Sequence, residues 1–92
     1  MKKQMMIFYM EGCPYCVNAR RAVRELQAEH AEYAAVPICW IDENKEADLA
    51  AAHDYYYVPT IYEGQTKLYE ASPADTYADI RRQVEAAFKA FL

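Results

Sequence analysis

The spacing of hydrophobic residues changes along the chain, and each change of period predicts a new element. Residues 4–10 form a nearly continuous apolar run, which is typical of a strand buried on both faces. From Cys13 to about Tyr33 apolar residues recur at helical spacing, and most charged side chains lie off that stripe. Residues 36–41 then indicate a second strand, and residues 44–54 a short helix that follows it.

The remaining third of the chain predicts a hairpin and a closing helix. Residues 58–62 and 67–70 indicate two strands, and the turn residues 63–66 lie between them. Ser72-Pro73-Ala74-Asp75 resembles a capping box with proline at the first helical position. We therefore expect the last helix over residues 73–91.

These elements have the order βαβαββα within a single domain, residues 1–92. A strand–helix–strand unit crosses over right-handed and makes its two strands parallel, whereas a hairpin adds antiparallel strands. We expect an α/β fold with a four-stranded mixed sheet and helices on both faces, because that arrangement buries every apolar helix stripe.

Composition and charge narrow the class of protein. Of the 92 residues, 54% are hydrophobic and 26% are charged, which is ordinary for a globular domain. A formal net charge of −4 removes the electrostatic basis for nonspecific binding to nucleic acid or to an anionic membrane. The first apolar run is too short for a signal peptide and has no small-residue cleavage site, and no run is long enough to span a membrane. We therefore expect a cytoplasmic protein.

Three cysteines, Cys13, Cys16 and Cys39, carry the candidate chemistry. An odd, low count without a signal peptide argues against a structural disulfide framework. Cys39 lies in the middle of the second predicted strand, which we expect to be central in the sheet. It is therefore expected to be a buried and unreactive core residue.

The strongest chemical signal is the Cys13-Pro14-Tyr15-Cys16 motif between the first strand and the first helix. Cysteines at positions i and i+3 of a first helical turn lie on one face, close enough to form a disulfide. Cys13 falls at the helix N-cap, where free backbone N–H groups and the helix dipole favour a thiolate, and Cys16 lies one turn further inside. This asymmetry predicts that Cys13 attacks a substrate disulfide and that Cys16 resolves the mixed disulfide.

Two other interpretations of the motif are weaker. A zinc site needs two more ligands, and the chain offers only His30, Cys39 and His53, none in a second knuckle spacing. Two structural cysteines could share this spacing by accident, but the strand, the motif and the proline-started helix all agree with a redox pair. We expect neither a metal nor a cofactor.

Val58-Pro59-Thr60, at the start of the third predicted strand, adds a second signal. Together with Gly12-Cys13-Pro14-Tyr15-Cys16 it makes the chain resemble a glutaredoxin of the thioredoxin-like superfamily over nearly its whole length. The resemblance implies a thioredoxin-like fold and a cis Val58-Pro59 bond that faces the cysteines. It also implies substrate contacts by Tyr15, Val58 and Pro59, with the Val58 backbone pairing to an extended substrate.

The implied activity is that of a small dithiol oxidoreductase, which reduces protein or low-molecular-weight disulfides through a reversible Cys13–Cys16 disulfide. Glutathione or a reductase would be its electron donor, and no nucleic acid or membrane partner is expected. The alternative that the resemblance leaves open is a binding module in which Cys13 and glutathione hold an iron–sulfur cluster between two subunits.

Several positions depart from the glutaredoxin pattern. The basic residue usual shortly before the first cysteine is replaced by Met10 and Glu11, and the Gly-Gly pair after the fourth strand is missing. Asp75 is expected to cap the last helix and not to bind a ligand. We therefore expect glutathione to bind poorly. The rings of Tyr55-Tyr56-Tyr57 are expected to pack their loop against the core and not to flank a groove.

Overall fold

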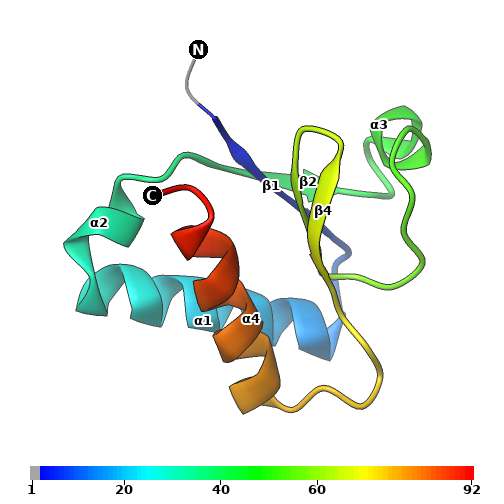
Figure 1. The fold of residues 1–92 in the computed structure, drawn as a ribbon. Helices are drawn as coiled ribbons and strands as arrows, with labels where there is room; N and C mark the ends of the chain where they lie inside the picture. The colour runs from blue at the N-terminus through cyan, green and yellow to red at the C-terminus, as the bar shows by residue number, and fades with distance from the viewer. Residues whose placement is uncertain (1–2) are drawn as a thin grey trace.

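The fold is given by a computed structural model that describes residues 3–92, and it has the predicted order of elements with one additional short helix. The strands and helices have the following bounds: β1 Met5–Tyr9, α1 Pro14–Glu29, α2 Ala31–Ala34, β2 Ile38–Asp42, α3 Ala47–Ala51, β3 Thr60–Glu63, β4 Thr66–Glu70 and α4 Tyr77–Lys89. Figure 1 shows their arrangement.

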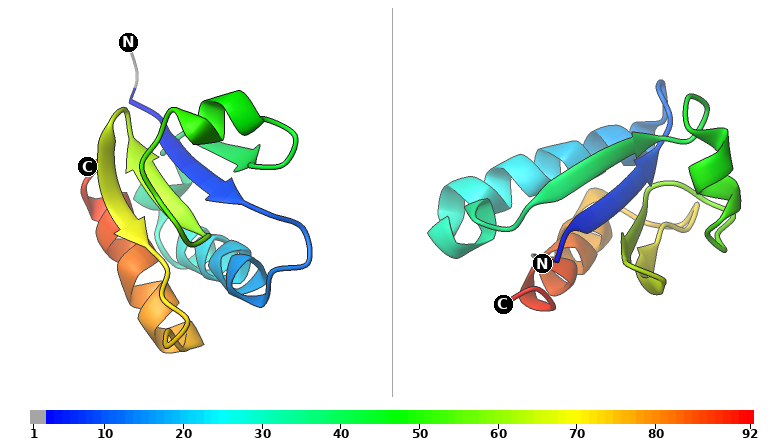
Figure 2. Two further views of the ribbon diagram at one scale, coloured as in Figure 1. Left: turned by 90° about the vertical axis from the view of Figure 1, so that its right-hand side faces the viewer. Right: turned by 90° about the horizontal axis from the view of Figure 1, so that it is seen from above.

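The strands form one mixed sheet with the order β2-β1-β3-β4. β1 runs parallel to β2 and antiparallel to β3, and the β3–β4 hairpin contains a bulge. Helices α1 and α4 cover one face of this sheet and α3 covers the other, as the two views of Figure 2 show. The expected four-stranded mixed sheet with helices on both faces, a thioredoxin-like α/β fold, is therefore confirmed.

Strand β1 supplies both hydrophobic cores, as its continuous apolar run predicts. Met5 and Ile7 are completely buried against α1 and α4. Phe8 is completely buried on the other face, where Ile41, Tyr62 and the α3 residue Ala50 pack against it. Alternate side chains of one strand thus hold both helical layers to the sheet.

The first predicted helix is interrupted near its end. His30 has an extended backbone (φ −134°, ψ 107°), so α1 ends at Glu29 and α2 begins a new turn. The apolar stripe nevertheless continues to Tyr33, whose ring stacks on Phe88 with centroids 4.8 Å apart. The helical spacing of apolar residues continues across the break because α1 and α2 both pack against α4.

The last helix begins later than predicted. Thr76 is its N-cap, and the side chain of Asp79 completes a capping box. The carboxylate of Asp75 instead accepts hydrogen bonds from the Tyr69 hydroxyl and the Ser72 N–H in the preceding turn. The prediction that Asp75 caps this helix was wrong because two Ser/Thr-x-x-Asp pairs follow one another, and only the second starts a helix.

Cys39 is half-buried, contrary to the prediction of a fully buried residue. Its strand, β2, is an edge strand of the sheet and not a central one. Helix α3 is also shorter than predicted, because the Asp42 side chain accepts a hydrogen bond from the Asn44 N–H and forms a turn there. Over residues 3–92 none of the helices is both long and apolar enough to cross a membrane.

Candidate active site at the CxxC turn

The two cysteines of the motif lie where β1 passes into α1. Gly12 has a positive φ of 80°, which turns the chain sharply after the strand. Cys13 follows as the N-cap of α1 with an extended backbone, and Pro14 occupies the start of the helix. Cys16 lies in the first turn and is 3% exposed. Both cysteines are free thiols.

The sulfur of Cys13 contacts the loop before β3. Its thiol donates a weak hydrogen bond to the Val58 carbonyl, with 3.8 Å between sulfur and oxygen, and it makes no hydrogen bond to the N–H groups of α1. The expectation that this sulfur faces the helix N–H groups was therefore wrong for the thiol. A thiol is a donor, so it turns toward a carbonyl, whereas the helix N–H groups are donors themselves.

The loop that carries this carbonyl is held firmly from the sheet. The Val58–Pro59 peptide bond is cis, as the resemblance implies. The carboxylate of Glu70 on β4 accepts hydrogen bonds from the N–H groups of Tyr56 and Tyr57 at 2.7 and 2.8 Å. The Pro59 carbonyl accepts a further bond from the N–H of Ala71. These bonds fix the Val58 carbonyl beside Cys13.

Cys16 differs from Cys13 in its surroundings. Burial raises the pKa of the Cys16 thiol well above its ordinary value, and the neighbouring Cys13 and Glu43 raise it further. A backbone hydrogen bond with Met10 acts in the opposite direction but is outweighed. Cys16 therefore stays protonated in the reduced protein.

A groove of about 340 Å³ opens beside Cys13. The residues lining it come from the CxxC turn, the end of β2, the loop before β3 and the loop before α4: Met10, Gly12, Cys13, Pro14, Tyr15, Glu43, Tyr56, Tyr57, Val58 and Pro73. Most of these present apolar surface. The groove thus brings together Cys13, Tyr15 and Val58 of the predicted site, while Cys16 and Pro59 lie buried behind it.

The tyrosines of the loop before β3 do not all pack inward. Tyr56 is 84% exposed and Tyr57 is 47% exposed, and both rings border the groove. Only Tyr55 packs against the core, where its hydroxyl donates to the Glu43 carboxylate at 2.7 Å. The expectation that all three rings pack inward was wrong for two of them, because Glu70 holds the loop by its backbone and leaves these rings free.

Tyr15 forms a hydrogen bond to the loop before α4. Its hydroxyl donates a hydrogen bond of 2.8 Å to the carbonyl of Pro73, in the loop before α4. The ring also packs against the main core. Tyr15 thereby joins the CxxC turn to a loop nearly sixty residues away in the sequence.

Sequence reasoning missed Glu43 and Pro73 as groove residues. A signal for Glu43 existed, because it directly follows β2, and β1 and β2 end at the same edge of the sheet. The Glu43 N–H continues the ladder by donating to the Tyr9 carbonyl at 2.9 Å. Pro73 gave no such signal, since only the tertiary bond from Tyr15 brings it to the site.

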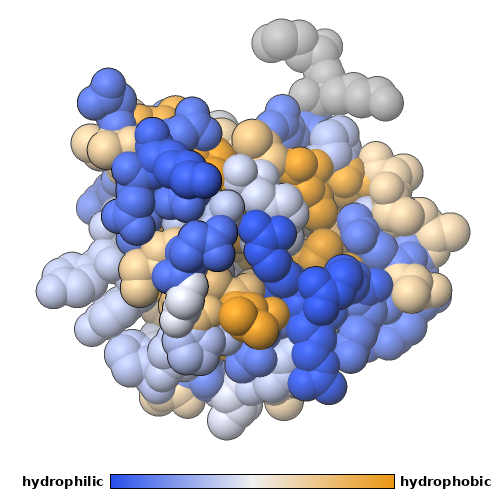
Figure 3. Space-filling model, turned by 180° about the vertical axis from the view of Figure 1, so that it is seen from behind, coloured by the Kyte–Doolittle hydropathy of each residue, from blue (hydrophilic) through white to orange (hydrophobic). Residues whose placement is uncertain are grey.

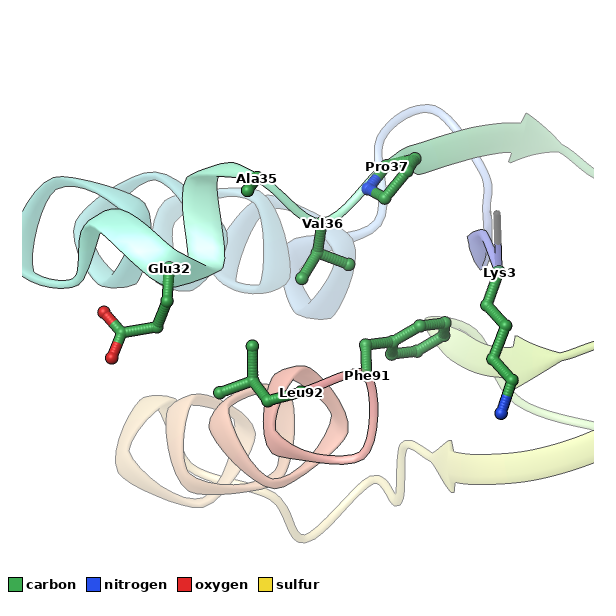
Figure 4. A pocket seen from close by; sticks show the side chains of 7 residues that line it. All are labelled: Lys3, Glu32, Ala35, Val36, Pro37, Phe91 and Leu92. Atoms are coloured by element: carbon green, nitrogen blue, oxygen red, sulfur yellow. The ribbon is translucent and has the colours of Figure 1, made fainter. Parts of the chain in front are cut away.

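Of the hollows that lie away from the cysteines, two are next to helices α1 and α2. One is formed by the segment around α2 and the end of α4, where Phe91 and Leu92 lie across from Val36 and Pro37 (Figure 4). Another lies between α1 and β2, where the Arg20 guanidinium covers the Trp40 ring at 4.2 Å. Figure 3 shows the molecule from behind, where strongly hydrophilic side chains break up the hydrophobic surface. Neither hollow contains a residue of the predicted site.

Metal ligands do not gather within the described part of the chain: residues 3–92 contain no group of three or more His, Cys, Asp or Glu side chains arranged to hold an ion.

Comparisons with known proteins place the chain in a family. A solved structure titled "Structure of a malarial protein" has a TM-score of 0.61 and 17% identity, and the match covers 92% of this chain and 96% of that one. At this identity the likeness concerns the fold alone. No curated protein matches the chain. The family model for the glutathione S-transferase N-terminal domain matches residues 7–82, which include the CxxC turn and the cis-proline loop. The chain therefore belongs to the glutathione S-transferase N-terminal domain family.

Proposed function

We propose that this protein is a small, glutaredoxin-like dithiol oxidoreductase that reduces disulfides through a reversible Cys13–Cys16 disulfide. The observation that carries the proposal is the contact between the Cys13 sulfur and the Val58 carbonyl, 3.8 Å apart. It brings a helix-capping cysteine of a CxxC motif against the residue before a cis-proline, beside an open groove. A reducing compartment such as the cytoplasm suits a working dithiol of this kind.

In the first step Cys13 acts as the nucleophile. It loses its proton to solvent, and its thiolate attacks one sulfur of the substrate disulfide. A bond forms between Cys13 and that sulfur while the substrate S–S bond breaks, and the second substrate sulfur leaves as a thiolate. Cys13 is the N-cap of α1 and lies next to the free N–H groups of its first turn.

In the second step Cys16 resolves the mixed disulfide. Its buried thiol gives up its proton as the sulfur attacks Cys13, and the first substrate sulfur leaves as a thiolate. The protein ends with a Cys13–Cys16 disulfide, and the substrate has gained two electrons. Its two thiolates take up protons from solvent, which balance the protons released by Cys13 and Cys16. The raised pKa of Cys16 keeps it from competing as the first nucleophile.

The Val58 carbonyl links these steps to substrate binding. In the reduced protein it accepts the Cys13 S–H, but a thiolate or a mixed disulfide has no proton to donate. Reaction at Cys13 therefore frees this carbonyl for an N–H of an extended substrate segment. The Val58 carbonyl can thus pair with the substrate while Cys13 is covalently bound to it.

A second candidate is a glutathione-dependent transferase or redox function, which the family match favours. Glutathione would then be either a bound co-substrate or the reductant of the oxidised protein. The groove argues against tight binding. Met10 stands where a cation would hold a glutathione carboxylate, and the charged side chain that lines the groove within residues 3–92 is Glu43, which repels such a carboxylate. A dedicated dithiol reductase is therefore the favoured electron donor.

The experiment that separates these functions compares electron donors. Reduction of the oxidised protein is followed with glutathione and with a thioredoxin-reductase system, and conjugation of glutathione to 1-chloro-2,4-dinitrobenzene is measured beside them. We expect faster reduction by the reductase system and negligible conjugation. A Cys39→Ser variant should behave like the wild type, whereas Cys13→Ser should be inactive. Efficient conjugation that survives in Cys13→Ser would contradict the oxidoreductase proposal.

A further inference from the structure

We propose that the groove beside Cys13 selects disulfides in extended polypeptide segments that carry a basic residue next to the reactive cysteine. The inference rests on the proposed oxidoreductase function and names its substrate class. Three features of the groove carry it: its ring-lined wall, the carboxylate in it and the backbone carbonyl at its floor.

The wall consists of exposed rings on a fixed backbone. The rings of Tyr56 and Tyr57 lie 4.9 Å apart, and their N–H groups are held by Glu70. Large exposed aromatic surface costs little conformational entropy on binding when its backbone is already ordered. Such a wall suits a lysine or arginine side chain. Its aliphatic stem can pack on the rings, and its charged group can interact with a ring face.

The carboxylate is that of Glu43, the one acidic side chain among the described residues that line the groove. The hydroxyl of Tyr55 donates to it at 2.7 Å, and burial together with Glu43 raises the pKa of Tyr55, so this hydroxyl stays a donor. The bond fixes Glu43 in place but leaves its charge uncompensated. The exposed Glu11, directly before the CxxC turn, adds to the negative potential.

Two cationic side chains, those of Arg20 and Lys67, make contacts of their own away from Glu43. The guanidinium of Arg20 covers the rings of Tyr9 and Trp40. The ammonium of Lys67 pairs with Glu70 at 2.7 Å. Lys45 makes no ion pair among the described residues, but it lines a separate hollow along α3 together with the acidic residues Glu46 and Asp48. The groove is therefore negative, which attracts a basic residue and repels the carboxylates of glutathione.

The carbonyl of Val58 makes an extended chain the fitting occupant. Once Cys13 has reacted, this carbonyl can accept a backbone N–H from a segment lying along the groove. Pairing of that kind would bring the residue next to the substrate cysteine toward the rings of Tyr56 and Tyr57 and toward the Glu43 carboxylate. A positive charge on that substrate residue is attracted by the Glu43 carboxylate, and a negative charge is repelled by it.

The test uses two synthetic peptides that differ only in a Lys or Glu beside one cysteine, each activated as a mixed disulfide with 2-thiopyridine. Release of thiopyridone gives the second-order rate of attack by Cys13. We expect the Lys peptide to react roughly five- to tenfold faster at low salt, and the ratio to fall toward one in about 0.5 M salt. In Glu43→Gln, which can still accept the Tyr55 bond, the ratio should drop at least twofold.

The matched control is Glu46→Gln. This carboxylate lies only three residues away but lines the hollow along α3, so the variant should keep the wild-type ratio. Equal rates for the two peptides, or an unchanged ratio in Glu43→Gln, would overturn the inference. Reaction with neutral 2-hydroxyethyl disulfide separates a failure of the charge preference from a failure of the oxidoreductase function. If Cys13 does not react with this disulfide either, the proposed function itself fails.

Discussion

Cys13 and Cys16 are three residues apart, yet their surroundings give them different chemistry. Both cysteines are buried, but Cys13 caps a helix and lines an open groove, whereas Cys16 lies in the first turn of that helix and does not line the groove. The sequence spacing predicted this division of roles. It could not show the Val58 carbonyl that accepts a hydrogen bond from the Cys13 thiol in the resting state, because that contact spans 45 residues.

The first prediction concerns Cys16 and pH. Its pKa is raised in the folded protein, so the folded state keeps this proton at pH values where the unfolded state loses it. Unfolding therefore becomes easier as the pH rises above the ordinary thiol pKa of 9.0. Between about pH 9 and pH 10 the free energy of unfolding should fall by about 1 kcal/mol from this group alone.

Urea unfolding of the reduced protein at these two pH values measures the effect. Cys16→Ser is the control, because serine does not ionise in this range. Between these two pH values the free energy of unfolding of the variant should fall by about 1 kcal/mol less than that of the wild type. Equal pH dependence in the two proteins would show that the Cys16 thiol is not held neutral by the fold.

At the scale of single elements, the starts and ends of helices were the hardest features to predict. The helical period from Cys13 to Tyr33 was visible in the sequence, but the break at His30 was not, since both halves face α4. The start of α4 was misplaced because Ser72–Asp75 and Thr76–Asp79 have the same residue spacing. Only the second pair, Thr76–Asp79, lies at the start of a helix.

The second prediction tests this assignment of the cap. Thr76→Ala removes the side chain that accepts the Asp79 N–H, and the free energy of unfolding should fall by about 1 kcal/mol. Ser72→Ala is the matched control, because its hydroxyl accepts only a 3.3 Å bond from Ala74 in an exposed turn. Chemical denaturation of both variants measures the difference. A larger loss in Ser72→Ala would place the cap where the sequence alone suggested it.

At the scale of the whole molecule, the fold was the most predictable feature. The apolar run of β1 and the amphipathic faces of α1 and α4 together leave few arrangements other than a layered mixed sheet. The position of β2 at the sheet edge was not predictable from its composition, and neither was the outward turn of Tyr56 and Tyr57. Both depend on contacts between distant segments.

The layered fold also explains why the parts of the candidate site meet in one region. β1 and β2 end at the same edge of the sheet, and the CxxC turn, Glu43 and the cis-proline loop meet there. The Tyr15–Pro73 bond brings in the loop before α4. Substrate contact by Tyr15 and Val58 remains our proposal, and the shape of the groove supports it.

The most direct test of the central proposal is to trap the intermediate. Cys16→Ser, in a Cys39→Ser background, is mixed with a disulfide-bonded protein substrate and its intact mass is recorded under non-reducing conditions. The proposal predicts a covalent adduct on Cys13 that a dithiol reductant releases, and none in the Cys13→Ser, Cys39→Ser variant. An adduct that forms on Cys16 in the latter variant, with none on Cys13 in the former, would contradict the assignment of Cys13 as the nucleophile.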